Sequence, residues 1–202
     1  MGEIDALRDA VRGRMSEKRF SHTLGVEKLA AHLGELVCPE RVFELRCAAL
    51  LHDIAKELPE AETLRLLSGV RGITDEDMKS HSVFHAFVGP EVIKRDFPEY
   101  ATPDILSSVF NHTTGAADMS LFDEIIFISD FAEEGRSYPA CREIAKKLDE
   151  RCRLAKNTDE CIKAIHKTTY DTLLSVISTL ERLEKPINSR TLLTRSAFAV
   201  KI

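Results

Sequence analysis

The chain has 202 residues, 44% hydrophobic and 30% charged, the balance of an ordinary globular protein of about one domain. Its net charge of −5 offers no basic field for nucleic acid, and no apolar run approaches the roughly 18 residues of a membrane span. The five cysteines are odd in number and none stands in C-x-x-C spacing, so we interpret them as apolar side chains in a reducing compartment. We therefore expect a cytoplasmic protein that binds neither nucleic acid nor membranes.

Apolar residues recur at helical spacing along nearly the whole chain, and no strand pattern is visible. The predicted helices cover approximately residues 4–15, 16–37, 39–53, 61–67, 80–97, 102–111, 121–134, 140–154 and 158–183, with a further capped start at Thr74. Gly89-Pro90 interrupts one of them, and because proline removes a helical hydrogen bond we expect a kink or a new start there. Residues 186–202 are expected to form a tail, either a strap across a site or a frayed end.

One short stretch carries unusual chemistry. Four apolar residues at positions 48–51 precede His52 and Asp53, so the end of a buried helix would deliver an imidazole and a carboxylate into the interior. Burying an ionised carboxylate costs several kcal/mol unless a cation or a hydrogen-bond network compensates it. A metal ion would do so, and His with Asp suits Fe, Mn or Zn. The alternative is that the two side chains cap the helix and bond to each other.

Similar groups stand on separate helical segments, each near an apolar face: His22, His85, His112 and Asp130. Asp130 closely follows the apolar run 125–128, a second run that delivers a carboxylate. The order His22, then His52-Asp53, then Asp130 resembles the H…HD…D motif of the HD superfamily of metal-dependent phosphohydrolases.

Longer segments resemble one branch of that superfamily. They are His22-Thr23-Leu24-Gly25-Val26, Leu51-His52-Asp53-Ile54-Ala55-Lys56, Phe84-His85-Ala86-Phe87-Val88-Gly89, His112-Thr113-Thr114-Gly115 and Ile126-Phe127-Ile128-Ser129-Asp130. Over roughly residues 15–185 the chain resembles the symmetrical bis(5'-nucleosyl)-tetraphosphatases, the YqeK-like HD proteins. The resemblance implies an all-α HD-domain helical bundle, here residues 1–185, that hydrolyses diadenosine tetraphosphate to two ADP at a di-iron centre.

The candidate ligands suffice for two metal ions. The expected metal ligands are His22, His52, Asp53, His85, His112 and Asp130. Asp53 would bridge the two ions, with His85 and His112 completing the second. Mixed imidazole and carboxylate ligation suits Fe, Mn or Co better than Mg, which prefers oxygen alone. His81 lies four residues before His85 on the same helical face and is the alternative ligand.

Three further residues are candidates for the bound phosphates. Lys56 lies one turn past His52 and could neutralise phosphate charge, or could be a solvated surface lysine. Thr113 offers a hydroxyl beside a ligand histidine, or belongs to an ordinary polar turn. Arg136 is the candidate for bidentate phosphate contact, with Glu133 as its orienting partner or as a surface ion pair of little consequence. We expect Asp53, Lys56 and Arg136 to be catalytic. The groups expected around the nucleotide are His22, Lys56, His85, His112, Thr113 and Arg136.

Phosphoanhydride cleavage needs charge neutralisation and a positioned nucleophile, which a pair of cations can supply. The predicted function is symmetrical hydrolysis of diadenosine tetraphosphate, with a nucleotide substrate and ADP as product. The alternatives are another HD-type phosphohydrolase, such as a nucleotidase or a phosphodiesterase, and a nucleotide-binding or ribosome-associated protein with a vestigial metal site. A homodimer is a further expectation, because the two long C-terminal helices could pack against a second copy.

Overall fold

The computed structural model describes residues 2–201, which form ten α-helices and four single-turn 3-10 helices without a strand. The α-helices are α1 (Glu3–Arg12), α2 (Glu17–Val37), α3 (Val42–Leu51), α4 (Glu60–Leu67), α5 (Phe84–Asp96), α6 (Pro103–Asn111), α7 (Leu121–Ala132), α8 (Pro139–Leu154), α9 (Thr158–Arg182) and α10 (Ser189–Phe198). The 3-10 helices are η1 (Pro39–Arg41), η2 (Asp77–Lys79), η3 (His81–Val83) and η4 (Pro98–Tyr100). The predicted all-α fold is confirmed. The helix start predicted at Thr74 leads only to the short η2.

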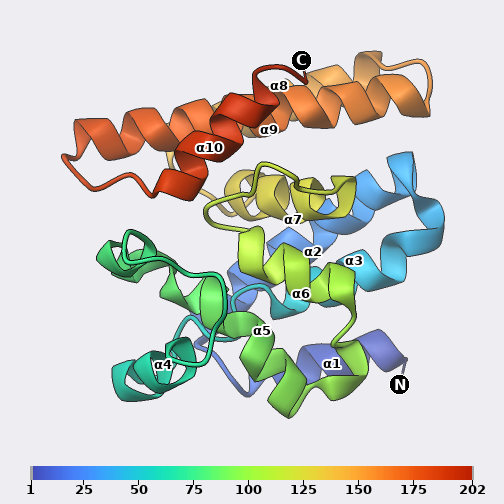
Figure 1. Ribbon diagram of the computed structural model, residues 1–202. Coiled ribbons are helices and arrows are strands. Elements are labelled where there is room, and N and C mark those ends of the chain that lie inside the picture. The colour runs from blue at the N-terminus through green and yellow to red at the C-terminus, as the bar shows by residue number, and fades with distance from the viewer. Residues whose placement is uncertain (1, 202) are drawn as a thin grey trace.

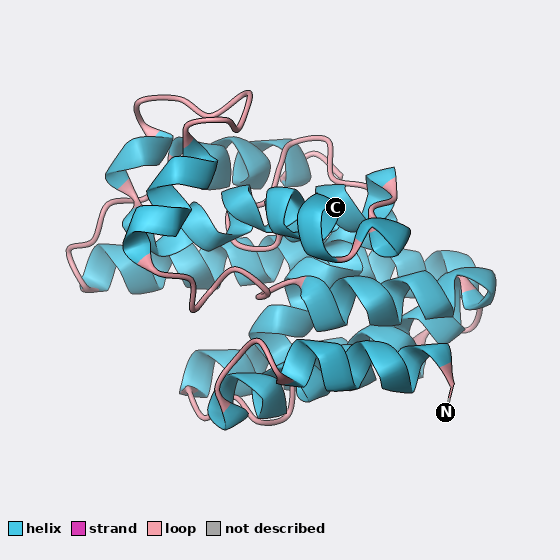
Figure 2. Ribbon diagram, turned by 90° about the horizontal axis from the view of Figure 1, so that it is seen from below, coloured by secondary structure: helices cyan, strands magenta, loops and turns pink. Residues whose placement is uncertain are grey.

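The helices stack in layers around α7 (Figure 1). At the top of the view, α8 and α9 lie side by side and α10 crosses α9. Beneath them α7 packs on α9 from one side and on α2, α3 and α6 from the other. Helix α5 joins this core through α6, and α1 joins it through α3. Figure 2 shows the same layers from below, with loops joining the helices. Among the described helices, none is long and apolar enough to span a bilayer.

Two helices are buried on nearly every side. Residues 47–51 of α3 and residues 122–129 of α7 are all buried, because both segments are apolar around most of the helix. Helix α2 approaches α3 closely at Gly34, where a Cβ atom would lie 2.6 Å from Leu45 Cδ1. Since α3 and α7 run through the interior, the polar residues at their carboxyl ends are brought into the protein rather than to its surface.

Helix α5 continues through Pro90, so of the two predicted alternatives, a kink or a new start, the new start is wrong. A Cβ atom on Gly89 would lie 2.6 Å from Val109 Cγ1, so α5 and α6 are in close contact here. Proline in a helix costs about 3 kcal/mol. The whole segment Phe84–Pro90 is buried against neighbouring helices, and we attribute the stability of the helix at Pro90 to this packing.

The predicted tail contains a packed helix. Phe198 of α10 is fully buried, and Thr194 lies against Gly115, where a Cβ atom would meet its Cγ2 at 2.7 Å. Before the helix, Asn188 donates a 3.0 Å hydrogen bond to the buried carboxylate of Asp77. Arg190 donates to the same carboxylate at 3.0 Å. The described part of the tail is therefore a strap over the turn that follows His112, not a frayed end.

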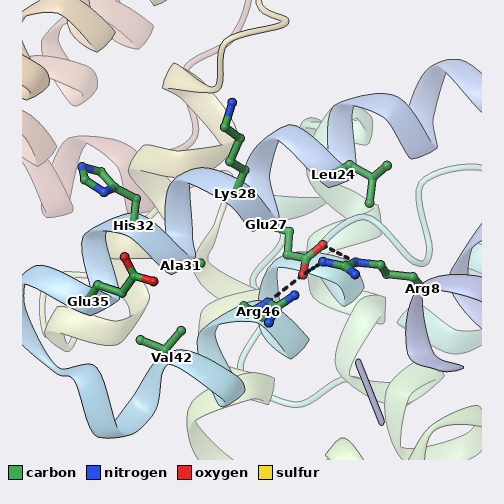
Figure 3. A pocket seen from close by; sticks show the side chains of 9 residues that line it. All are labelled: Arg8, Leu24, Glu27, Lys28, Ala31, His32, Glu35, Val42 and Arg46. Carbon is green, nitrogen blue, oxygen red and sulfur yellow. Dashed lines mark hydrogen bonds and ion pairs between the residues drawn. The ribbon is translucent and has the colours of Figure 1, made fainter. Parts of the chain in front are cut away.

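A buried carboxylate ties the first three helices together. Glu27 of α2 is 2% exposed and accepts hydrogen bonds from Arg8 of α1 at 2.8 and 2.9 Å and from Arg46 of α3 at 2.8 Å. Figure 3 shows both guanidinium groups meeting Glu27 in a surface hollow, with the side chain of Glu35 further along the same helix. The two arginines neutralise a charge that would be costly to bury alone.

Replacing Glu27 with Gln should lower the free energy of unfolding by about 2 kcal/mol, because two charge-assisted hydrogen-bond partners lose their carboxylate. Urea denaturation measures this, and Glu35→Gln is the control, with an expected change within about 0.5 kcal/mol. Equal effects of the two substitutions would show that the Glu27 cluster contributes nothing specific.

Candidate metal centre

The six predicted ligands converge from five parts of the chain. His52 and Asp53 lie in the turn after α3, and both are buried, with Asp53 4% exposed. The others are His22 on α2, His85 on α5, His112 just after α6 and Asp130 on α7. The chain places His52-Asp53 here because the preceding apolar residues of α3 pass through the core.

Hydrogen bonds to the backbone fix the orientation of two imidazoles. Nδ1 of His52 lies 2.7 Å from the carbonyl oxygen of Ala49, and Nδ1 of His112 lies 2.7 Å from that of Val109. A carbonyl only accepts, so each Nδ1 carries the proton and each Nε2 presents a lone pair to the centre. Nε2 of His52 is buried and has no hydrogen-bond partner within residues 2–201. Such an orphaned nitrogen is typical of a missing ligand group.

Asp53 lies between two sets of donors. Its Oδ1 is 3.2 Å from His85 Nε2 and 3.6 Å from His112 Nε2. Its Oδ2 is 3.4 Å from His52 Nε2 and 3.9 Å from His22 Nε2. The two oxygens of one carboxylate therefore face different pairs of imidazoles.

Asp130 completes the second of these sets. Its Oδ1 lies 2.9 Å from His22 Nε2 and 3.7 Å from His52 Nε2. His22 Nε2 is close to this oxygen but is not aligned for a hydrogen bond, and it is buried without a partner in the described chain. In this set, the nitrogens of His22 and His52 approach Asp130 without a hydrogen bond to it, as is consistent with a cation between them. The nitrogen and oxygen donors present here fit a transition metal.

Electrostatics keeps these groups in the protonation states that a metal requires. Burial opposes ionisation of Asp53, but its contacts with His52, His112 and His85 hold the pKa of Asp53 well below its ordinary value. Burial opposes ionisation of Asp130 too, but its contacts with His22 and His52 and the charge of Arg136 hold the pKa of Asp130 below its ordinary value. Burial lowers the pKa of His85 to about 4, so its ring is neutral at neutral pH.

Three cations surround the acidic centre. Arg19 Nη1 lies 2.7 Å from Asp53 Oδ2. Arg136 donates to Asp130 through Nη2, which bonds to the carboxylate, and through Nε, which lies 2.9 Å from the backbone oxygen. Lys56 Nζ lies 3.1 Å from His85 Nε2, and burial lowers the pKa of this lysine. Lys56 is half-buried at the centre rather than a solvated surface residue.

Other predicted contacts differ in detail. Glu133 does not pair with Arg136: it is buried and lies 3.1 Å from His22 Nδ1, the nitrogen opposite the centre. The predicted Glu133–Arg136 pair is therefore wrong, because the turn after α7 directs Glu133 toward α2. The Thr113 hydroxyl is buried and has no hydrogen-bond partner in the described chain. His81 stacks on Phe84, whereas His85 lies beside Asp53.

The sequence interpretation missed Arg19. It lies three residues before His22, a spacing that places both on one face of α2. That spacing was the available signal, but a surface arginine at the start of a helix has the same pattern.

The comparisons with known proteins agree with this geometry. The HD domain family matches residues 19–161. A symmetrical bis(5'-nucleosyl)-tetraphosphatase of Bacillus subtilis is 30% identical over 142 residues, 67% of this chain and 72% of that protein. Another of the same name from Halalkalibacterium halodurans is 27% identical over 184 residues, 91% of this chain and 90% of that protein.

A solved structure has the same fold. The crystal structure of a predicted HD superfamily hydrolase involved in NAD metabolism from Clostridium acetobutylicum superposes with a TM-score of 0.82 at 24% identity, covering 100% of both chains. Together with the ordered His22, His52-Asp53 and Asp130 set, these matches establish that the chain belongs to the HD superfamily of phosphohydrolases and, within it, to the YqeK-like type.

Proposed function

We propose that the protein hydrolyses dinucleoside polyphosphates symmetrically, converting diadenosine tetraphosphate to two ADP, at a pair of metal ions held by the six convergent side chains. The observation that carries the proposal is the position of Asp53, whose two carboxylate oxygens face separate donor sets. A bridging carboxylate between two such sets suits two neighbouring cations. The names of the relatives from B. subtilis and H. halodurans support the choice of substrate.

We assign one ion to His22, His52, Asp53 and Asp130, and the other to Asp53, His85 and His112. When bound, such ions supply a nucleophile at neutral pH and stabilise charge on phosphate oxygens. Iron is the preferred occupant, with Mn or Co as alternatives, because the donors mix imidazole and carboxylate.

The cations of the chain bind and orient the substrate. Arg136 carries a planar guanidinium at the edge of the centre and can contact two oxygens of one phosphate. Arg19 and Lys56 contribute positive charge beside Asp53 and His85, respectively. Phosphoryl transfer depends largely on such positioning and charge stabilisation, so three cations around one centre favour a highly anionic substrate.

Two hollows adjoin the centre on different sides of Asp53. One, of about 720 Å³, is lined by His22 and Arg136, which belong with the Oδ2 side of Asp53. The other, of about 390 Å³, is lined by Lys56 and His85, which belong with the Oδ1 side. A substrate with a nucleoside at each end of a polyphosphate could place one end in each hollow. This arrangement favours a two-ended substrate over a mononucleotide.

We also propose a cytoplasmic location and a homodimer. All five cysteines are free, as a reducing compartment favours. Three leucines near the ends and on the face of the last two long helices are exposed: Leu154 in α8, Leu174 in α9 and Leu183 just after α9. They offer apolar surface against which a second copy of the chain can pack.

The direct test is incubation of the metal-loaded, reduced protein with diadenosine tetraphosphate under anaerobic conditions, with products separated by chromatography. We expect ADP as the sole nucleotide product. Release of AMP and ATP would contradict symmetrical cleavage. No cleavage, with orthophosphate released from mononucleotides or ring opening of cyclic nucleotides, would replace the proposal with a nucleotidase or a phosphodiesterase.

Asp53→Asn should reduce the metal content of the purified protein below two ions per chain. Loss of a residue that only hydrogen-bonds to a metal ligand typically lowers activity about 10- to 100-fold. Because Asp53 is itself a proposed ligand, the rate of ADP release should fall by more than this. Elemental analysis and the same product assay measure both effects. Asp118→Asn, an exposed aspartate in the α6–α7 loop, is the control and should change neither. Full metal content and activity in the Asp53 variant would contradict the bridging role.

Glu133→Gln should weaken metal affinity about 10- to 100-fold, because Glu133 bonds to the outer nitrogen of His22 and fixes the ring. Competition with a chelator of known affinity measures the change. Glu134→Gln is the matched control: this neighbour is exposed and pairs with Lys28 at the surface. If both variants hold metal like the unmodified protein, Glu133 does not support the ligand set.

A further inference from the structure

A histidine outside the metal centre lines the hollow next to it. His81 lies in η3, and its ring stacks on Phe84 with centroids 4.8 Å apart and planes inclined by 26°. Phe84 is 5% exposed and belongs to the packed helix α5, whereas His81 is exposed. One face of the imidazole therefore has a rigid aromatic support, and the ring remains accessible to a flat ligand.

The lining of the hollow mixes charged, aromatic and aliphatic side chains. Its inner end contains His85, which faces Asp53, and Lys56, whose ammonium group lies beside His85. The lining also includes Leu58, Leu64 and the carboxylate of Glu60, and Leu64 is 43% exposed despite its size. A hollow that combines the cation Lys56 beside the centre with aromatic and aliphatic side chains suits a ligand that carries both a phosphate and an aromatic base.

We propose that this hollow is an adenosine subsite, in which His81, supported by Phe84, provides the stacking surface for the base and Lys56 contacts the phosphate leading to the centre. The inference rests on the proposed function for the identity of the nucleotide. It assigns His81 a role in substrate binding, distinct from the metal ligation that its spacing from His85 left open.

The hollow on the other side of Asp53 has a different lining. It contains Lys18, Arg19 and Arg136. Tyr138, its aromatic residue, is 67% exposed. Its three cations outnumber its two carboxylates, Glu57 and Glu133, and favour phosphate contacts there, whereas the His81–Phe84 pair favours base stacking. We therefore expect the identity of the base to be sensed mainly on the His81 side.

The test compares His81→Ala and His81→Phe in the full-length, metal-loaded protein. Calorimetric titration measures binding of ADP and of pyrophosphate, which has phosphates but no base, and steady-state kinetics measures KM and kcat for diadenosine tetraphosphate. His32→Ala, an exposed histidine in the hollow of Figure 3, is the control.

Loss of the stacking surface should weaken ADP binding and raise KM by about tenfold in His81→Ala, since stacking on an aromatic ring contributes about 1–3 kcal/mol per base and 1.4 kcal/mol corresponds to tenfold. Pyrophosphate affinity and kcat should stay within about twofold, because phosphate contacts remain. His81→Phe should restore most of the ADP affinity, since a phenyl ring also stacks. His32→Ala should match the unmodified protein.

Three results would overturn the subsite: unchanged ADP binding and KM in His81→Ala, equal losses for ADP and pyrophosphate, or failure of His81→Phe to restore binding. Failure of the proposed function is a separate result. If the unmodified protein releases no ADP from diadenosine tetraphosphate yet binds ADP in a His81-dependent manner, the subsite stands and the assigned reaction falls.

Discussion

The structure depends on the compensation of one buried carboxylate. Asp53 is 4% exposed, and an ionised aspartate in such a position requires positive charge or hydrogen-bond donors around it. Four imidazoles and the guanidinium group of Arg19 lie within 4 Å of its oxygens. Arg19 is the one full positive charge among these groups, and its guanidinium bonds to Oδ2 alone. A cation on each side of the carboxylate would complete the compensation and use the nitrogen lone pairs at the same time.

The helical architecture serves this centre by placing polar residues where buried helices end. Helices α3 and α7 are apolar on nearly all sides and therefore run through the interior. Asp53 follows the end of one, and Asp130 lies in the last turn of the other. Hydrogen bonds to the carbonyl groups of Ala49 and Val109 then fix two imidazoles without recruiting further side chains. Backbone geometry and core packing thus position these groups, and the side chains of Arg19, Arg136 and Glu133 add polar contacts to Asp53, Asp130 and His22, respectively.

Much of this centre could be predicted from the sequence, because polar residues directly after apolar runs are conspicuous and their order matches the HD motif. The six candidate ligands, the all-α fold and most helix bounds were recognised in this way. The roles of Arg19 and Glu133 were not. Each depends on a partner distant in sequence: 34 residues separate Arg19 from Asp53, and 111 separate His22 from Glu133. The spacing of residues along one helix does not reveal which charged side chain of a neighbouring helix each of them will contact.

Two further differences also arise from tertiary contacts. Local preference favours an interruption at Gly89-Pro90, but close packing on α6 accompanies a continuous helix. Residues 186–202 were expected to form a strap or a frayed end, and the buried carboxylate of Asp77 binds Asn188 and Arg190 and holds α10 on the domain. In both cases a contact made far away in sequence outweighs the local signal.

The most direct test of the central claim is anomalous diffraction at the metal absorption edge from crystals of the metal-loaded protein. The account predicts two anomalous peaks, one beside each carboxylate oxygen of Asp53, with His22, His52 and Asp130 around one and His85 and His112 around the other. A single peak, or metal bound away from Asp53, would contradict it.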